Sequence, residues 1–277
     1  MNMDKKRGVF QNKKEIKKVL PHCNFFPKNH KGQLTVFIII GIVIVGFAVL
    51  VYVFYPNLKS NLGFETQNPS AFVESCLEDA VSENVNTISL QGGSLEPENY
   101  ILYDNQKIEY LCYTLEDYKT CVVQQPLLKN HVEEEINKGI NAQARECLNE
   151  MKKNYETKGY NVNIKQGDIK VELLPKRIVV RFNDSVTLTK EGSDKFESLE
   201  AIYNNNLYEL LSIATSIINW EATYGDAETT SYMNYYRDLK VEKKKQSDGS
   251  TIYILTDRNN KNKFQFASRS VAWPPGY

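Results

Sequence analysis

The sequence predicts an α+β protein with one N-terminal transmembrane helix, followed by an ectodomain of about three long helices packed on an antiparallel sheet. Residues 34–55 form an apolar run without a charged residue. Three later segments repeat apolar residues at three- and four-residue spacing, and short alternating segments lie between and after them. We expect a basic cytoplasmic leader (1–32), a transmembrane helix (33–55), a linker (56–68) and an extracellular α+β domain (69–277).

The apolar run is long enough to cross a membrane. Of its 22 residues, 16 are Ile, Val, Leu or Phe. At about 1.5 Å rise per residue the helix would reach about 33 Å, against a hydrocarbon core of about 30 Å. Residues 1–32 carry nine Lys or Arg and two acidic residues, a net charge of +7, which favours a cytoplasmic N-terminus. We therefore expect a single-pass protein of the cell membrane, with lipid as a partner.

A short motif, Lys31-Gly32-Gln33-Leu34-Thr35, stands in front of this run. It resembles the class III signal of archaeal type IV pilin-like proteins, in which a prepilin-type peptidase cuts before the Gln and leaves the apolar helix on the mature protein. The resemblance implies processing between Gly32 and Gln33 and the peptidase as a partner. Phe37 stands where that family usually has Glu. The runs 74–77 (Glu-Ser-Cys-Leu) and 90–93 (Leu-Gln-Gly-Gly) are similar to those of uncharacterised single-pass archaeal surface proteins.

The first elements of the domain have clear boundaries. Asn68-Pro69-Ser70 is typical of a helix start, and Gly92-Gly93 of its end. Segments 100–103 and 108–113 flank polar turn residues and predict a hairpin. A second helix follows Pro126 and ends near Gly159, with nine apolar residues on one face: Leu128, Val132, Ile136, Ile140, Ala144, Cys147, Leu148, Met151 and Tyr155.

The remaining elements alternate between strand and helix patterns. A third helix is predicted over 194–220, with Phe196, Leu199, Ile202 and Tyr203 on its inner face. β-branched and aromatic residues bounded by turn residues predict strands before and after it. These strands cover 160–166, 168–174, 177–182, 185–190, 239–246, 251–257 and 263–269.

Four cysteines fall in the predicted extracellular domain, and Cys23 lies in the leader. An even number on the oxidising side of a membrane favours disulfides. Three pairings are possible. We favour Cys112–Cys121, which closes a local loop, and Cys76–Cys147, because both cysteines lie on the apolar faces of predicted helices. A four-cysteine zinc site is the alternative, although no two of these cysteines have the spacing of a zinc ligand pair.

Little in the sequence points to catalysis. His131, with Glu134 and Glu135, has the residue types of a metal site, but its place among charged residues favours a solvated helix face. No serine-nucleophile, phosphate-binding or dinucleotide motif is present, so we predict no catalytic, metal or cofactor site and no enzyme activity. The balance of 34 basic and 34 acidic residues argues against a nucleic-acid partner.

Aromatic residues and one sequon are the remaining candidates for function. Tyr232, Tyr235, Tyr236 and the aromatic, proline-containing residues 273–277 could form a docking surface, and Asn183 begins the one glycosylation sequon. We expect a membrane-anchored cell-surface protein, pilin-like at its N-terminus, with a structural, adhesion or envelope-assembly role through self-association or envelope proteins. The alternative is an extracellular ligand-binding or sensory domain that acts through a partner protein.

Overall fold

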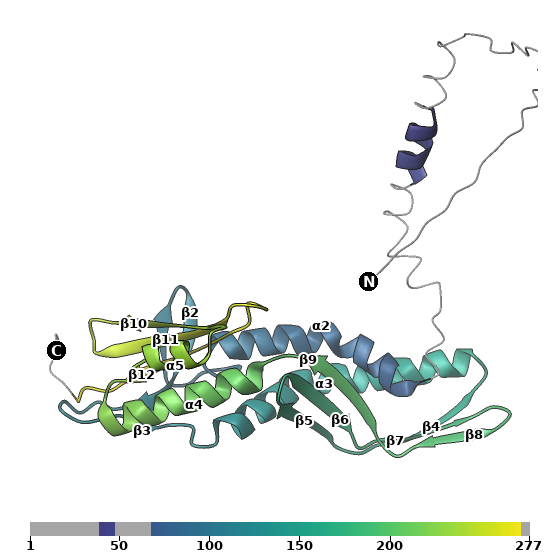
Figure 1. The fold of residues 1–277 in the computed structure, drawn as a ribbon. Helices are drawn as coiled ribbons and strands as arrows, with labels where there is room; N and C mark the ends of the chain where they lie inside the picture. Colours follow the sequence, from purple (N-terminus) through teal and green to yellow (C-terminus); the bar gives the residue numbers. More distant parts are fainter. Residues whose placement is uncertain (1–38, 48–67, 273–277) are drawn as a thin grey trace, which may run out of the picture. The chain divides into compact units, whose positions relative to one another are not determined.

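The structure, a computed structural model, describes residues 39–47 and 68–272. The chain divides into two compact units, Met1–Phe64 and Glu65–Tyr277. The second unit contains all the labelled helices and strands of Figure 1, and the fold is described within that unit.

The membrane anchor predicted from the sequence is not found among residues 39–47 and 68–272, and the predicted single-pass localisation is corrected accordingly. Residues 39–47 are helical. In the described part of the chain, no helix combines the length and the apolar character needed to cross a membrane. The rest of the predicted span, together with Gly32 and Gln33, lies outside the described residues, so processing there stays a prediction.

The predicted architecture of three long helices on one antiparallel sheet is also wrong. Residues 68–272 form a mixed, sheet-rich α+β fold, and within them α3 (Leu128–Thr157) is the one long helix, with 30 residues. In the described residues from 68 onward it is accompanied by α2 (Pro69–Leu90, 22 residues), α4 (Leu207–Tyr224, 18 residues) and the short α5 (Thr230–Tyr235).

The strands form three sheets instead of one. The largest has the order β1-β2-β12-β11-β10, with β3 paired to β2, and the two smaller ones have the orders β4-β7-β8 and β5-β6-β9. The β2–β12 pair is parallel and the other pairs are antiparallel. The strands are β1 (Tyr100–Tyr103), β2 (Gln106–Tyr113), β3 (Val122–Val123), β4 (Asn161–Lys165), β5 (Ile169–Leu174), β6 (Arg177–Phe182), β7 (Ser185–Thr189), β8 (Ser193–Phe196), β9 (Leu199–Asn204), β10 (Leu239–Lys245), β11 (Ser250–Asp257) and β12 (Lys263–Arg269).

The predicted third helix, 194–220, combines two different elements. Its first part forms β8 and β9, and helix α4 begins only at Leu207. β9 pairs with β6 along its whole length, for example Ala201 with Val180, and this pairing buries Leu199 and Ala201 completely. The hydrogen bonds and burial gained by joining the β5-β6 hairpin outweigh the helical spacing of the apolar residues.

Helices α2 and α3 are joined by a disulfide. The nine predicted face residues of α3 are all buried. Helix α3 packs against α2. Asn68 is the N-cap of α2, and its side chain accepts a hydrogen bond from the Ser70 backbone N–H at 3.0 Å. Cys76 of α2 is bonded to Cys147 of α3, and Cys112 of β2 is bonded to Cys121, so both predicted pairings are confirmed.

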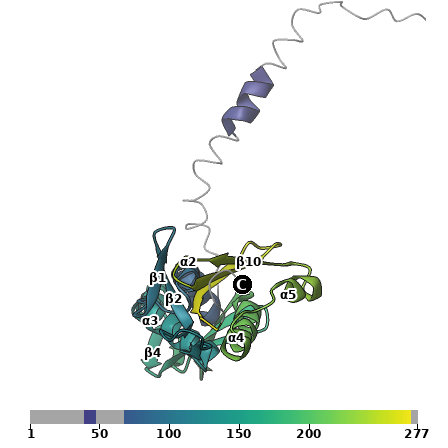
Figure 2. The ribbon, with the colours of Figure 1, turned by 90° about the vertical axis from the view of Figure 1, so that its left-hand side faces the viewer.

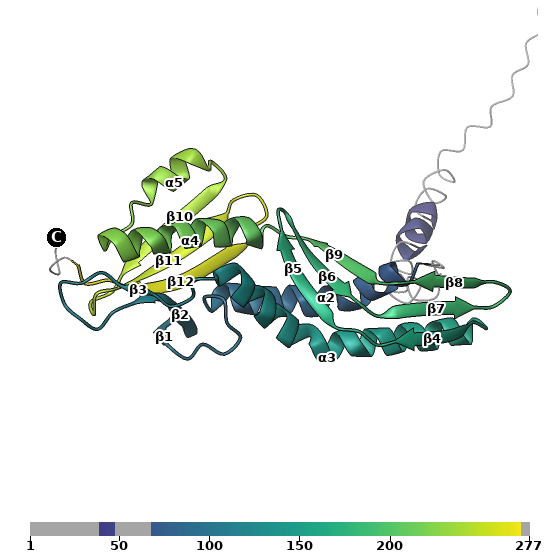
Figure 3. The same ribbon diagram turned by 90° about the horizontal axis from the view of Figure 1, so that it is seen from below.

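Helix α4 lies against the largest sheet, where it contacts β12, β2, β3 and β11. Helix α5 lies beside α4 and against β10, as seen from two directions in Figures 2 and 3. The chain thus places two helices that are adjacent in sequence side by side at one border of the sheet, and the surface between them is the candidate site.

Candidate functional site: an aromatic pocket between α4 and α5

A cavity of about 340 Å³ opens between α4 and α5. This volume is at the lower end of the range of ligand pockets in proteins. Aromatic side chains form most of its wall. It is lined by Ser216 and Trp220 of α4, Glu228 of the connecting loop, and Ser231, Tyr232, Tyr235 and Tyr236 of α5 and its end.

The aromatic side chains at the pocket are unusually exposed for their type. Tyr235 is 81% exposed, and Trp220 and Tyr236 are each 46% exposed. Tyr224, one turn beyond Trp220, is 56% exposed, and the two ring centroids lie 4.6 Å apart. The rings of Tyr235 and Tyr236 meet edge to face at 4.8 Å. A cluster of exposed aromatic rings around a concave surface is typical of a binding site.

Sequence reasoning found part of this cluster and missed the rest. Tyr232, Tyr235 and Tyr236 were predicted as a docking surface, and the structure places all three at the pocket. Trp220 and Tyr224 were not singled out, although their four-residue spacing places them on one face of a helix. That spacing on the helix before a glycine is the signal that could have found them.

Gly225 ends α4, and the chain then turns so that α5 lies beside α4. Gly225 ends α4 in the left-handed conformation, with φ of +80°, and its N–H donates to the Glu221 carbonyl at 2.9 Å. Glycine takes this conformation without a steric penalty, which explains the residue. Three residues later, the Glu228 carboxylate accepts a hydrogen bond from the Thr230 N–H at 2.7 Å and so stabilises the first turn of α5.

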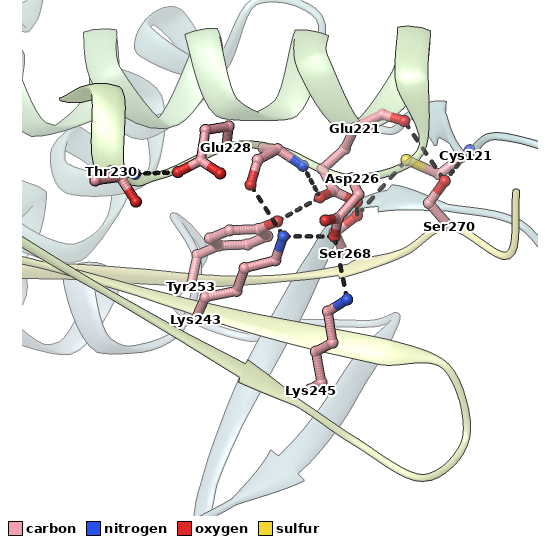
Figure 4. Close-up of polar contacts among 11 residues, drawn as sticks. Cys121, Glu221, Asp226, Glu228, Thr230, Lys243, Lys245, Tyr253, Ser268 and Ser270 are labelled. Atoms are coloured by element: carbon pink, nitrogen blue, oxygen red, sulfur yellow. Dashed lines mark hydrogen bonds and ion pairs between the residues drawn. The ribbon is translucent and has the colours of Figure 1, made fainter. Parts of the chain in front are cut away.

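The loop between the helices is held by a buried carboxylate (Figure 4). The side chain of Glu221 accepts hydrogen bonds from the Ala227 N–H at 2.9 Å, from the Ser268 hydroxyl at 3.0 Å and from the Tyr253 hydroxyl. Glu221 is only 2% exposed, and Tyr253 and Ser268 are fully buried. One side chain of α4 therefore ties the loop to β11 and β12 at once.

Two lysines of β10 hold the same loop from the other side. The Lys243 ammonium donates to the Asp226 carboxylate and, at 2.9 Å, to the Ala227 carbonyl. Lys245 lies 3.6 Å from the same Asp226 carboxylate. Strand β10 thus holds the α4–α5 loop in place through Lys243 and Lys245. Together with Glu221, these contacts make the pocket a preorganised surface.

Some of the polar groups of the pocket are engaged within the protein. The Ser216 and Tyr232 hydroxyls are hydrogen-bonded to each other at 2.8 Å, and one oxygen of Glu228 is bonded to Thr230. Hydrogen bonding from Thr230 lowers the pKa of Glu228, so this exposed carboxylate is ionised at neutral pH. The surface consequently offers aromatic ring faces and one negative charge.

Burial of Glu221 should make the stability of the protein depend on pH. Burial raises the pKa of Glu221 above its usual value of 4.5. A raised pKa in the folded state favours folding below pH 4.5, and this contribution is lost as the pH rises through the folded-state pKa. Glu221→Gln keeps an acceptor for Tyr253 and Ala227 but cannot ionise. We expect the variant to gain stability relative to the wild type as the pH rises from 4.5, by at most about 1.4 kcal/mol per pH unit.

Urea unfolding of both proteins between pH 4 and 8 measures this difference. Burial also raises the pKa of Glu109, so only the difference between variant and wild type isolates Glu221. Glu191→Gln is a control because Glu191 is exposed. Its stability relative to the wild type should not increase as the pH rises. A Glu221→Gln difference that shrinks as the pH rises would mean that the fold favours the ionised carboxylate.

A second polar cluster contains the histidine that the sequence placed on a solvated face. His131 is instead partly buried, and its Nε2 lies 2.8 Å from the Ser94 hydroxyl, which donates to the Glu109 carboxylate. Ser, His and an acid are the residue types of a catalytic triad, but here the acid contacts the serine and not the imidazole. Ser94 is 6% exposed, so this arrangement serves to hold the Gly92-Gly93 turn against β2.

The other predicted site residues do not gather at the pocket. Asn183 is exposed in the loop between β6 and β7, and its amide donates to Asp168 at 3.1 Å. Glycosylation there stays a prediction. The four cysteines form the two disulfides, so their thiolates are not available to zinc.

Comparison with known proteins gives no relative. No protein-family model, curated protein or solved structure matches this chain.

Proposed function

We propose that this is a binding protein whose α4–α5 pocket takes an extended, proline-containing segment of a partner protein. The observation that carries the proposal is the convergence of Trp220, Tyr232, Tyr235 and Tyr236 on one cavity. Binding of this kind would serve an assembly or adhesion role.

The chemistry of the pocket favours such a segment over a hydroxyl-rich ligand. Proline-rich segments adopt the polyproline II conformation in advance, lose little entropy on binding, and dock on grooves lined by aromatic side chains. A carbohydrate would instead need several unused hydrogen-bonding groups around the rings. Ser216 and Tyr232 are engaged with each other, and Glu228 with Thr230.

The proposal is tested by fluorescence anisotropy of a dye-labelled, blocked peptide Tyr-Pro-Pro-Pro-Tyr. We expect saturable binding that Trp220→Ala weakens by at least tenfold, because truncating a tryptophan at the centre of an interface typically costs about 2 kcal/mol or more. An oligosaccharide such as maltohexaose should not compete.

Tyr100→Ala is the matched control. Tyr100 is also a partly exposed aromatic residue, 38% exposed, but it lies on β1, and its ring contacts Lys107. Its loss should leave the binding unchanged. If the peptide does not bind, or if both alanine variants weaken it equally, the α4–α5 pocket is not a peptide site. Competition by the oligosaccharide would assign the pocket to sugars.

A further inference from the structure

The last described residues of the chain lie beside the C-terminal end of α4. Ala272 lies so close to the end of α4 that a Cβ atom on Gly225 would be 2.3 Å from the Ala272 Cβ. The Ser270 hydroxyl donates to the Glu221 carbonyl of α4 at 3.5 Å and accepts from the Cys121 N–H at 3.3 Å. The point at which residues 273–277 begin is therefore fixed beside the last turn of α4, which carries Tyr224.

The following five residues are long enough to reach the pocket. In the polyproline II conformation they would extend about 15 Å, at about 3.1 Å per residue. Trp220 precedes Gly225 by five residues, which corresponds to about 7.5 Å along the helix axis. This axial distance is about half of the length that the five residues would span.

Residues 273–277 are also of the types that pack on aromatic side chains. Their sequence is Trp273-Pro274-Pro275-Gly276-Tyr277, with two adjacent prolines between aromatic residues and no charged side chain. Proline has no N–H to satisfy, and its ring packs on aromatic faces. Such a segment matches a surface made mostly of aromatic rings.

We propose that residues 273–277 occupy the α4–α5 pocket of their own chain and that a partner segment must displace them. A segment tethered beside a site has an effective concentration in the millimolar range, so the chain's own segment outcompetes that of a second copy at ordinary protein concentrations. This inference rests on the proposed function and adds its regulation: a partner segment binds the pocket in competition with residues 273–277.

The chain offers its own reporter for the test. Its two tryptophans are Trp220 and Trp273, so full-length protein with Trp220→Phe keeps a ring in the pocket and leaves Trp273 as the single fluorophore. We expect acrylamide to quench Trp273 weakly and equally at all protein concentrations. Adding Tyr235→Ala and Tyr236→Ala should raise the quenching several-fold. Strong quenching before the pocket is altered would overturn the inference, and shielding that appears only at high protein concentration would assign the pocket to a second copy.

A second measurement separates this inference from the proposed function. Removing residues 273–277 should tighten binding of the Tyr-Pro-Pro-Pro-Tyr peptide about tenfold, as expected for release of a competitor at millimolar effective concentration. Equal binding to the full-length and shortened proteins would refute the displacement and leave the peptide-binding function intact. Failure of the peptide to bind either protein would refute the function, whatever the quenching of Trp273 shows.

Discussion

Replacing Cys76 and Cys147 together by alanine should lower the free energy of unfolding by about 4 kcal/mol. The bond joins residues 71 positions apart and connects α2 with α3. In the chain-entropy model, a crosslink stabilises the fold by restricting the unfolded chain, and a longer closed loop gives a larger effect. Because α2 and α3 form the framework on which the smaller sheets pack, we expect a cooperative loss and not a local one.

The second disulfide is the matched control for loop length. Cys112 and Cys121 are nine positions apart, and the same model gives about 3 kcal/mol for their bond. Equilibrium unfolding in urea of the two double-alanine variants compares the effects directly. A smaller loss for Cys76→Ala/Cys147→Ala than for Cys112→Ala/Cys121→Ala would contradict the loop-entropy explanation.

Arg145→Ala should be comparably destabilising, by about 3–5 kcal/mol, because it leaves a buried carboxylate without its cation. The guanidinium of Arg145, on α3, donates to Asp184 at 2.9 Å and to the Gly167 carbonyl at 2.6 Å. The side chain of Asp184 is fully buried and also accepts from the Gly167 N–H at 3.2 Å. These bonds join α3 to the turns before β5 and after β6.

Two further variants make this prediction specific. Arg181 also forms two ion pairs, with Glu172 and Glu200, but all three side chains are more than one-third exposed, so Arg181→Ala should cost no more than about 1 kcal/mol per pair. Adding Asp184→Asn to Arg145→Ala removes the unpaired charge and should recover part of the stability in urea unfolding. Similar losses for the Arg145 and Arg181 variants would show that burial of Asp184 does not determine the effect.

The sequence predicted those elements whose signals are local. The apolar face of α3 repeats over thirty residues, and each of its nine residues is buried as predicted. The Cys76–Cys147 disulfide was found for the same reason, since both cysteines lie on helix faces that must meet, and Cys112–Cys121 was found because it closes a short loop. The strands β5 and β6 have β-branched residues and a turn between them, and the structure has both at the predicted positions.

The errors come from interactions between distant parts of the chain. Phe196, Leu199 and Ile202 have helical spacing, but β9 is formed by its pairing with β6. The parallel pairing of β2 with β12 joins segments that a local pattern cannot bring together. The number of sheets and the length of the helices follow from such pairings and not from periodicity.

The pocket illustrates the same limit. Tyr235 and Tyr236 could be singled out as aromatic residues, but their approach to Trp220 depends on the loop that follows Gly225. That loop is held by Glu221 through Tyr253 and Ser268. In the sequence Glu221 is one carboxylate among many, and only the fold shows that it is buried and bonded to two strands.

The most direct measurement is an NMR titration of the isotope-labelled protein with the blocked peptide Tyr-Pro-Pro-Pro-Tyr, with the Trp220 indole N–H as the reporter. We expect this signal and the backbone amides of α4, α5 and the loop between them to shift together and to saturate at the same peptide concentration. Shifts concentrated elsewhere, such as the groove along α2 lined by Glu74, Glu78 and Tyr203, with Trp220 unchanged, would contradict it.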